Sequence, residues 1–437
     1  MQRTSPDQEM ITVTTAEMPM STVPTTSPVT RSKHMPTTLA FLCGCIALLM
    51  TGYGIIIPVF PQRLQALGLG AETLALMEGA FALGTFLFSI PMGMLANCVG
   101  RKPIVFLSLA GFILTNLALA LVNIPLLFIL IRFIEGTLIS GLMPASMAMV
   151  GDSIPMREQG RWIGMITTAQ AMGIALGPGI GGFLYQVWGA FYPFLISAGI
   201  ALMASLLALF VLPETLPEYV REQARLQKVK KQTDTQRRTD ASSITRLVWL
   251  FAPLLLIDCG LTFIYPFVLP QYPFFFEKVL KYSAAQYGII ISAYSLSLAV
   301  FPLLLGRLSE IPSKKLLIIL GSFLYPVMNM GLLFLHQYPL LIAAAIMTGM
   351  GSALLLPALG TIYLEATIEQ NRSHVMGIRG SAISLGALLG PLAQAIVAHW
   401  ITPQITFAIG IALSLLMALL ASVMLKNVAY PKPRFSQ

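Results

Sequence analysis

The sequence predicts an all-α integral membrane protein, with twelve transmembrane helices arranged as two pseudo-symmetric bundles of six. Three observations support this fold class: apolar segments long enough to span a bilayer, basic residues confined to one side, and an internal repeat. The composition agrees, because 56% of the 437 residues are hydrophobic and only 10% are charged. A soluble globular protein carries about 25% charged residues. We therefore expect most of the surface to face lipid.

Each predicted span is an apolar segment of roughly 20 residues, the length of helix that crosses about 30 Å of hydrocarbon. The N-terminal bundle (37–212) contains spans at 38–60, 74–96, 104–122, 126–150, 162–186 and 190–212. The C-terminal bundle (247–425) contains spans at 247–270, 285–306, 315–334, 339–363, 375–399 and 405–425. A charged linker (213–246) joins them. Residues 1–36 are polar and rich in Thr, Ser and Pro, which predicts a disordered cytoplasmic tail, and 426–437 form a second tail.

The basic residues predict that both termini are cytoplasmic. In that orientation Arg63, Lys278 and Lys281 lie in outer loops and Arg132 lies in a span, which leaves 23 of the 27 Lys and Arg residues inside. This is the positive-inside pattern of multi-pass proteins. It accounts for the net charge of +9 without a nucleic-acid partner. We expect a protein of the plasma membrane or of a bacterial inner membrane.

The two halves repeat each other at one offset. Adding 213 to a residue number in the first half returns the same residue type at many Gly and Pro positions, among them the pairs Gly136 and Gly349, Pro144 and Pro357, Gly177 and Gly390, and Pro178 and Pro391. In the first span of each half the offset is 212. Parallel repeats of six helices are the plan of a rocking transporter, whose substrate site lies near the middle of the membrane between the halves.

Four motifs resemble those of the major facilitator superfamily. Residues 93–102 (Gly-Met-Leu-Ala-Asn-Cys-Val-Gly-Arg-Lys) are similar to its signature loop, and 306–315 are a weaker copy. Residues 132–136 (Arg-Phe-Ile-Glu-Gly) resemble its arginine-x-x-glutamine-glycine motif, and 173–182 resemble its "antiporter" motif. Residues 52–61 are similar to a motif of the twelve-span drug:proton antiporters. The resemblance covers nearly the whole chain after residue 36.

The signature loop is predicted to take part in gating. By resemblance, the segment that includes Gly93, Asn97, Gly100 and Arg101 latches the halves at the cytoplasmic side, with Arg101 paired to Asp152. Asn97 stands where the family usually has aspartate, so it supplies no charge to this cluster. The alternative is that Arg101 is only a positive-inside residue.

A stripe of small residues is the second predicted gating element. Gly173, Gly177 and Gly181 are spaced by four, so they lie on one helix face and allow a neighbouring helix to approach closely. Pro178 removes one helical hydrogen bond and bends the helix. By resemblance the stripe lies where the halves meet, while ordinary helix packing is the alternative.

Four ionisable residues fall within predicted spans, where a charge is costly unless it has a partner or water. Arg132 and Glu135 are three residues apart and can pair, either as a structural ion pair or as a proton site. Asp258 has no charged neighbour on its own helix face, so we expect a proton or a cationic solute as its partner. Glu78 lies near the outer surface, so a solvated carboxylate is as good an interpretation as a functional one.

Asp258, Glu135 and Arg132 are therefore the candidates for proton coupling. A carboxylate taken out of water binds a proton more readily, and a nearby guanidinium opposes this. Tyr53, Tyr265 and Asp258 are the candidates for the wall of a substrate cavity.

These observations predict a secondary active transporter, monomeric, that exports a small drug-like or lipophilic compound in exchange for protons by alternating access. A proton symporter or facilitator for a polar metabolite or organic anion is the first alternative, since Arg132 could bind a carboxylate. A non-transporting membrane receptor is the second. An enzyme is not expected, because the four His residues are scattered and no phosphate-binding loop occurs, and neither a metal nor a cofactor is implied.

Overall fold

The computed structural model describes residues 35–219, 221–222, 238–304, 314–367 and 369–424. The predicted tails, apart from residues 35–36, and residues 220 and 223–237 of the predicted linker lie outside these ranges. Every regular element in the described ranges is a helix, and twelve helices there are long and apolar enough to cross a membrane. The predicted fold class is thereby confirmed.

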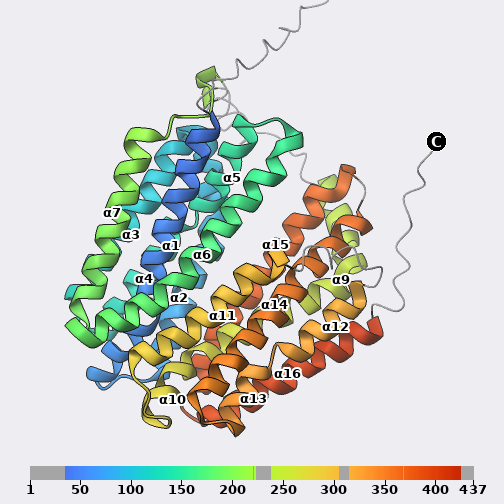
Figure 1. The fold of residues 1–437 in the computed structure, drawn as a ribbon. Coiled ribbons are helices and arrows are strands. Elements are labelled where there is room, and N and C mark those ends of the chain that lie inside the picture. Colours follow the sequence, from blue (N-terminus) through green and yellow to red (C-terminus); the bar gives the residue numbers. More distant parts are fainter. Residues whose placement is uncertain (1–34, 220, 223–237, 305–313, 368, 425–437) are drawn as a thin grey trace, which may run out of the picture.

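The first half forms one bundle (Figure 1). Its helices are α1 (Met35–Ala66), α2 (Ala71–Val99), α3 (Arg101–Leu121), α4 (Pro125–Ile139), α5 (Leu142–Ser153), α6 (Met156–Trp188) and α7 (Phe191–Val211). Together α4 and α5 make the fourth span, which is interrupted at residues 140–141. One apolar core, with buried side chains from each of these seven helices and most of them from α1, α3, α5 and α7, holds this bundle together.

The second half forms the other bundle (Figure 1). Its elements are α9 (Arg238–Val268), the 3-10 turn η1 (Leu269–Gln271), α10 (Tyr272–Lys278), α11 (Ala284–Leu304), α12 (Lys314–Leu324), α13 (Val327–Phe334), α14 (Tyr338–Ala366), α15 (Glu369–Val397) and α16 (Pro403–Met424). The seventh span runs through α9, η1 and α10 without a gap. Two separate apolar cores fill this bundle.

The two bundles contact each other mainly at one end. We call the end with the α2–α3 turn and the last residue of α7 the linker end, and the opposite end, with α10, the far end. At the far end, the backbone of Gly182 on α6 lies against the carbonyl of Ala284 on α11, and Gly79 on α2 lies against Leu392 on α15. Toward the linker end the bundles diverge (Figure 1).

Candidate functional site

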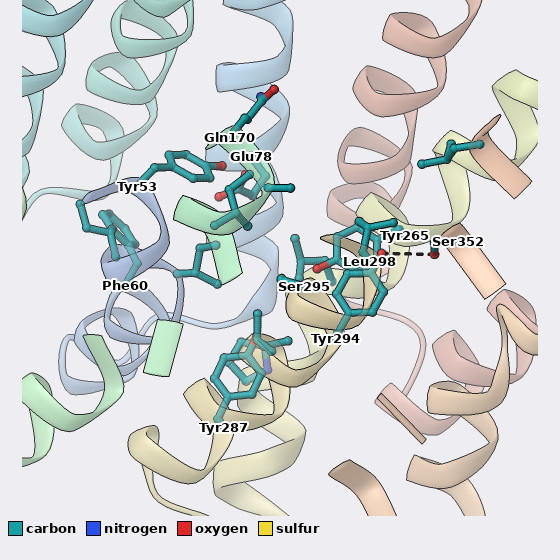
Figure 2. Close-up of a pocket in the computed structure, with 18 of the residues that line it drawn as sticks. Tyr53, Phe60, Glu78, Gln170, Tyr265, Tyr287, Tyr294, Ser295, Leu298 and Ser352 are labelled. Carbon is teal, nitrogen blue, oxygen red and sulfur yellow. Dashed lines mark hydrogen bonds between the residues drawn. The ribbon is translucent and has the colours of Figure 1, made fainter. Parts of the chain in front are cut away.

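A cavity of about 580 Å³ lies between the two halves (Figure 2). Its polar lining comes from both: Tyr53, Glu78, Arg132, Thr167 and Gln170 in the first half, and Tyr265, Tyr287, Tyr294, Ser295 and Ser352 in the second. The predicted residues Tyr53 and Tyr265 therefore do line the cavity. Asp258, predicted with them, does not.

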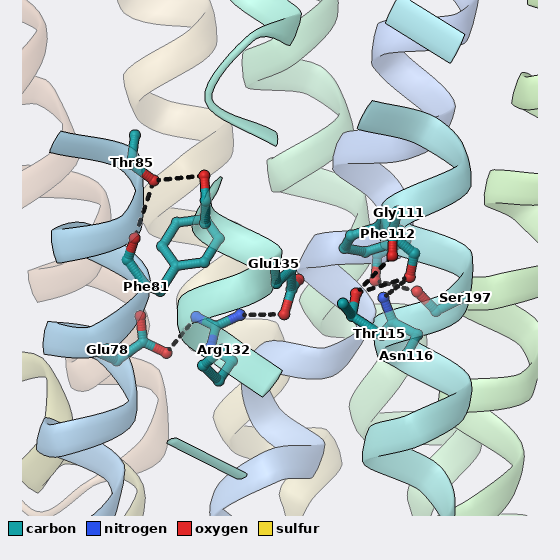
Figure 3. Close-up of polar contacts among 12 residues, drawn as sticks. Glu78, Phe81, Thr85, Gly111, Phe112, Thr115, Asn116, Arg132, Glu135 and Ser197 are labelled. Carbon is teal, nitrogen blue, oxygen red and sulfur yellow. Dashed lines mark hydrogen bonds and ion pairs between the residues drawn. The ribbon is translucent and has the colours of Figure 1, made fainter. Parts of the chain in front are cut away.

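Three charged side chains form one cluster in the wall of the first half (Figure 3). Arg132 Nη2 donates to Glu78 Oε1 at 2.9 Å, and Arg132 Nη1 donates to Glu135 Oε2 at 3.2 Å. The guanidinium carbon of Arg132 also lies 4.4 Å from the ring centroid of Phe81. The side chain of Glu78 is 26% exposed and that of Glu135 is 1% exposed. Glu78 therefore meets the cavity, while Glu135 lies behind it.

The predicted pair of Arg132 and Glu135 is thus present, and Glu78 is a third member of the cluster that the prediction did not include. Its side chain is paired with Arg132 and is also partly exposed. Glycine makes this possible: the backbone of Gly136 on α4 lies directly against the carbonyl of Phe81 on α2, so the two helices approach closely. The occurrence of three ionisable residues in the second and fourth spans is the sequence feature that could have predicted this cluster.

The expectation that Asp258 pairs with a proton or a solute was wrong. Arg379 Nε on α15 donates to Asp258 Oδ2 on α9 at 2.9 Å, and the Asp258 side chain is 1% exposed. The ring of Tyr363 lies 5.1 Å from the guanidinium carbon. The count of 23 cytoplasmic basic residues includes Arg379, whereas the structure places it within α15, paired with the buried Asp258. A buried carboxylate and a partly buried guanidinium on different helices neutralise each other here.

Arg63 is a further correction, because it belongs to α1 and not to an outer loop. Its guanidinium donates to three carbonyl oxygens at the end of α3, those of Leu119 at 2.6 Å, Ala120 at 2.8 Å and Val122 at 2.8 Å. These are carbonyls that a helix terminus leaves without partners. Arg63 therefore caps α3 and connects it to α1.

The segment predicted as a loop, 93–102, consists of two helix ends joined by one residue. Gly100 alone separates α2 from α3, with φ of +122°, and Glu214 lies directly against it. The Glu214 carboxylate accepts hydrogen bonds from the backbone amides of Arg101 at 2.9 Å and Lys102 at 3.2 Å. Any other residue at position 100 would be strained by the positive φ, and its side chain would also clash with this carboxylate.

The predicted pair of Arg101 and Asp152 is present, with Arg101 Nε 3.2 Å from Asp152 Oδ2. Asn97 accepts a further hydrogen bond from Arg101 through its side-chain oxygen. Gly93 lies within α2, where its nearest neighbour is Pro144. All of these residues belong to the first half, so the structure shows the cluster but not its contact with the second half.

The glycine stripe of α6 packs inside the first half, against α1, and not where the halves meet. Gly173 lies against Met50, Gly177 against the carbonyl of Thr51, and Gly181 against the carbonyl of Ile55. The opposite face of the same segment meets the second half, because the carbonyl of Pro178 lies against Gly288 on α11. The motif therefore combines packing on one face with an interface on the other.

Comparison with known proteins identifies the family. The family model of the Major Facilitator Superfamily matches residues 42–283 and 254–437. "Multidrug resistance protein 2" of Bacillus subtilis is 28% identical over 364 residues, which cover 81% of this chain and 87% of that protein. "Quinolone resistance protein NorA" of Staphylococcus aureus is 25% identical over 372 residues, covering 84% and 92%.

The fold is shared with solved transporters. The crystal structure of a bacterial homologue of the human lysosomal transporter Spinster, in an inward-facing and occupied conformation, superposes with a TM-score of 0.71 at 14% identity, covering 90% of this chain and 98% of that one. The resemblance predicted from the motifs is confirmed by these matches, and the chain belongs to the major facilitator superfamily.

Proposed function

We propose that this protein exports a small drug-like or lipophilic organic compound in exchange for protons, by alternating access. The observation that carries the proposal is that two carboxylates, Glu78 and Glu135, share one guanidinium, that of Arg132, at the wall of a cavity between the halves.

Charge makes this cluster a candidate proton site. One guanidinium neutralises one carboxylate, so the ionised cluster carries one uncompensated negative charge in a largely apolar surrounding. Such a charge is costly to hold there. Binding a proton or a cationic substrate removes the cost, and the two compete for the same site. In the pair of Asp258 and Arg379 the charges are already balanced, so we rank Asp258 as the second candidate for proton coupling.

Two observations support export. The distribution of basic residues indicates that the linker end is cytoplasmic, and the bundles diverge toward that end (Figure 1), which supports access to the cavity from the cytoplasm or inner leaflet. The relatives named above are drug resistance proteins, which favours export. We place the protein in a plasma membrane or bacterial inner membrane, as a monomer with both termini inside.

An organic-anion symporter or facilitator is less well supported. A substrate carboxylate at Arg132 would add a third negative charge beside a single guanidinium, because Glu78 and Glu135 both already accept hydrogen bonds from it. A receptor that does not transport would bind compounds without any flux.

The test is proton flux in proteoliposomes containing the full chain, with a panel of lipophilic amines, neutral aromatic compounds and organic acids. We expect amines to drive proton movement in the wild type, Glu135→Gln and Glu78→Gln to abolish it, and Asp258→Asn to reduce it less. Glu72→Gln is the matched control, since Glu72 is an exposed carboxylate at the start of the same helix as Glu78. Substrate flux without proton flux would overturn the coupling, and binding without flux would favour a receptor.

A further inference from the structure

The two walls of the cavity differ in chemistry. Among the residues that the structure describes, every charged side chain in the lining comes from the first half. The second half contributes hydroxyl groups, those of Tyr265, Tyr294, Ser295 and Ser352 among them. Figure 2 shows Tyr53, Glu78 and Gln170 on one side of the cavity and these hydroxyl residues on the other.

Ser295 is the most informative of these residues. Helical Ser and Thr side chains in this protein commonly donate to the carbonyl four residues earlier, as Thr51 does to Ala47 at 2.8 Å and Ser414 does to Gly410 at 2.7 Å. Ser295 is buried, at 6% exposure, yet its hydroxyl has no hydrogen-bond partner among the described residues. A hydroxyl that faces a cavity without a partner is ready to bind a ligand.

The hydroxyl groups near Ser295 show whether this wall of the cavity lacks hydrogen-bond donors or acceptors. Ser352 donates to the carbonyl of Thr348 at 3.1 Å, so its only proton is used, and Tyr294, 3.5 Å from Ser352, is the donor of that pair. The ring of Tyr265 stacks on that of Tyr294 with centroids 5.5 Å apart. The hydroxyls of Tyr265 and Tyr287, like that of Ser295, have no acceptor in the part of the chain that the structure describes. Three donors on this wall therefore lack an acceptor. Two of them adjoin Tyr294, because Ser295 follows it in the sequence and Tyr265 stacks on its ring.

We infer that Ser295 and Tyr265 form a subsite that binds an uncharged hydrogen-bond acceptor of the substrate, a carbonyl or ether oxygen. This inference rests on the proposed function and adds a specificity to it. The acceptor end of the substrate faces the second half, and its opposite end faces Glu78 and Arg132 in the first. A site with buried donors discriminates against a compound without the acceptor, because the donors then stay unpaired.

The experiment compares two probes of the same shape, a fluorenone and a fluorene that carry the same dimethylaminoethyl chain. They differ only in a ring carbonyl against a ring methylene. Isothermal titration of purified full-length protein is expected to show about tenfold tighter binding of the ketone. Ser295→Ala and Tyr265→Phe each lower that preference, and the double variant binds both probes equally.

Ser381→Ala is the matched control, because Ser381 is a helical serine whose hydroxyl donates to Gly377 outside the cavity. It is expected to keep the tenfold preference. Equal binding of both probes by the wild type, or an unchanged preference in the double variant, overturns the subsite while the proposed function stands. If neither probe binds, the subsite and the proposed amine site both fall. If the ketone is preferred but drives no proton flux in proteoliposomes, the subsite stands and the coupling falls.

Discussion

The backbone amide of Gly179 on α6 donates a hydrogen bond of 2.9 Å to the hydroxyl of Ser292 on α11, and so joins the two halves of the protein. The repeat supplies a second contact of the same kind. Residue 79 is the counterpart of residue 292, and residue 392 is the counterpart of residue 179, at the offset of 213. There the Leu392 side chain packs against Gly79, and its Cδ2 atom lies 2.7 Å from the place that a Cβ atom on residue 79 would occupy. Each far-end contact thus places a side chain against a glycine, and only one of them includes a hydrogen bond.

We expect Ser292→Ala to favour the form in which the far end is open, by about threefold to tenfold, because one hydrogen bond between the halves is lost. The measurement is the distance distribution between spin labels at positions 67 and 279, which are exposed far-end residues of different halves. Ser297→Ala is the control, since Ser297 donates to the carbonyl of Ile346 within the second half. Identical distributions in wild type and Ser292→Ala would contradict the expectation.

Gly136→Ala should separate α2 from α4 and weaken the pair of Glu78 and Arg132. A new methyl group at this position meets the Phe81 backbone, which cannot move without its helix. Overpacking of this kind costs about 1–3 kcal/mol. We expect a lower midpoint of thermal unfolding together with weaker amine binding, and neither effect in Gly199→Ala, where nothing lies within 4 Å of the added carbon. A midpoint equal to that of wild type would argue against the close approach.

Arg379→Ala should destabilise the protein more than loss of the whole ion pair. The single change leaves Asp258 buried without a counter-ion, which costs about 3–5 kcal/mol. At the repeat offsets, the first half has Ile46 and Ile166 where the second has Asp258 and Arg379, and both isoleucines are buried. We therefore expect the double variant Asp258→Ile with Arg379→Ile to recover most of the thermal stability.

Recovery of stability with normal transport would make this pair structural. Recovery of stability with loss of proton flux would instead give the pair a part in coupling.

Arg63→Met should loosen the far end of α3, because its last carbonyls lose their donors while the apolar stem of the side chain is kept. The cost is on the order of 2 kcal/mol. Hydrogen exchange of the amides near residue 119 is expected to become faster. Lys278→Met is the control, as Lys278 is an exposed basic residue at the same end. Unchanged exchange in Arg63→Met would show that the cap is dispensable.

The sequence predicted relationships along one helix better than those between helices. Arg132 and Glu135 were paired correctly because three residues bring side chains to one helix face. Their third partner, Glu78, and the partner of Asp258, Arg379, were both missed because they lie on other helices. Spacing along a chain defines a face, but it does not say which helix covers that face.

Errors at the ends of spans had a similar origin. A boundary uncertain by a few residues moved Arg63 out of α1, and the count of basic residues placed Arg379 in a loop although a predicted span contained it. The motifs predicted one contact between helices correctly, since the pair of Arg101 and Asp152 is present. The glycine stripe shows their limit: three residues spaced by four predicted a close helix contact, but not that the partner is α1.

The odd number of charges around Arg132 also determines how membrane voltage acts on the proposed exchange. In the empty, ionised state, the cluster of Glu78, Arg132 and Glu135 carries one negative charge through the membrane field as the halves move. In the protonated state it carries no net charge. Exchange of one proton for a monovalent cation then transfers no net charge, whereas exchange of one proton for a neutral compound transfers one. A voltage of 100 mV is worth about 2.3 kcal/mol per elementary charge. The potential across the bilayer would therefore drive the export of neutral compounds, and only the proton concentration gradient would drive the export of cations.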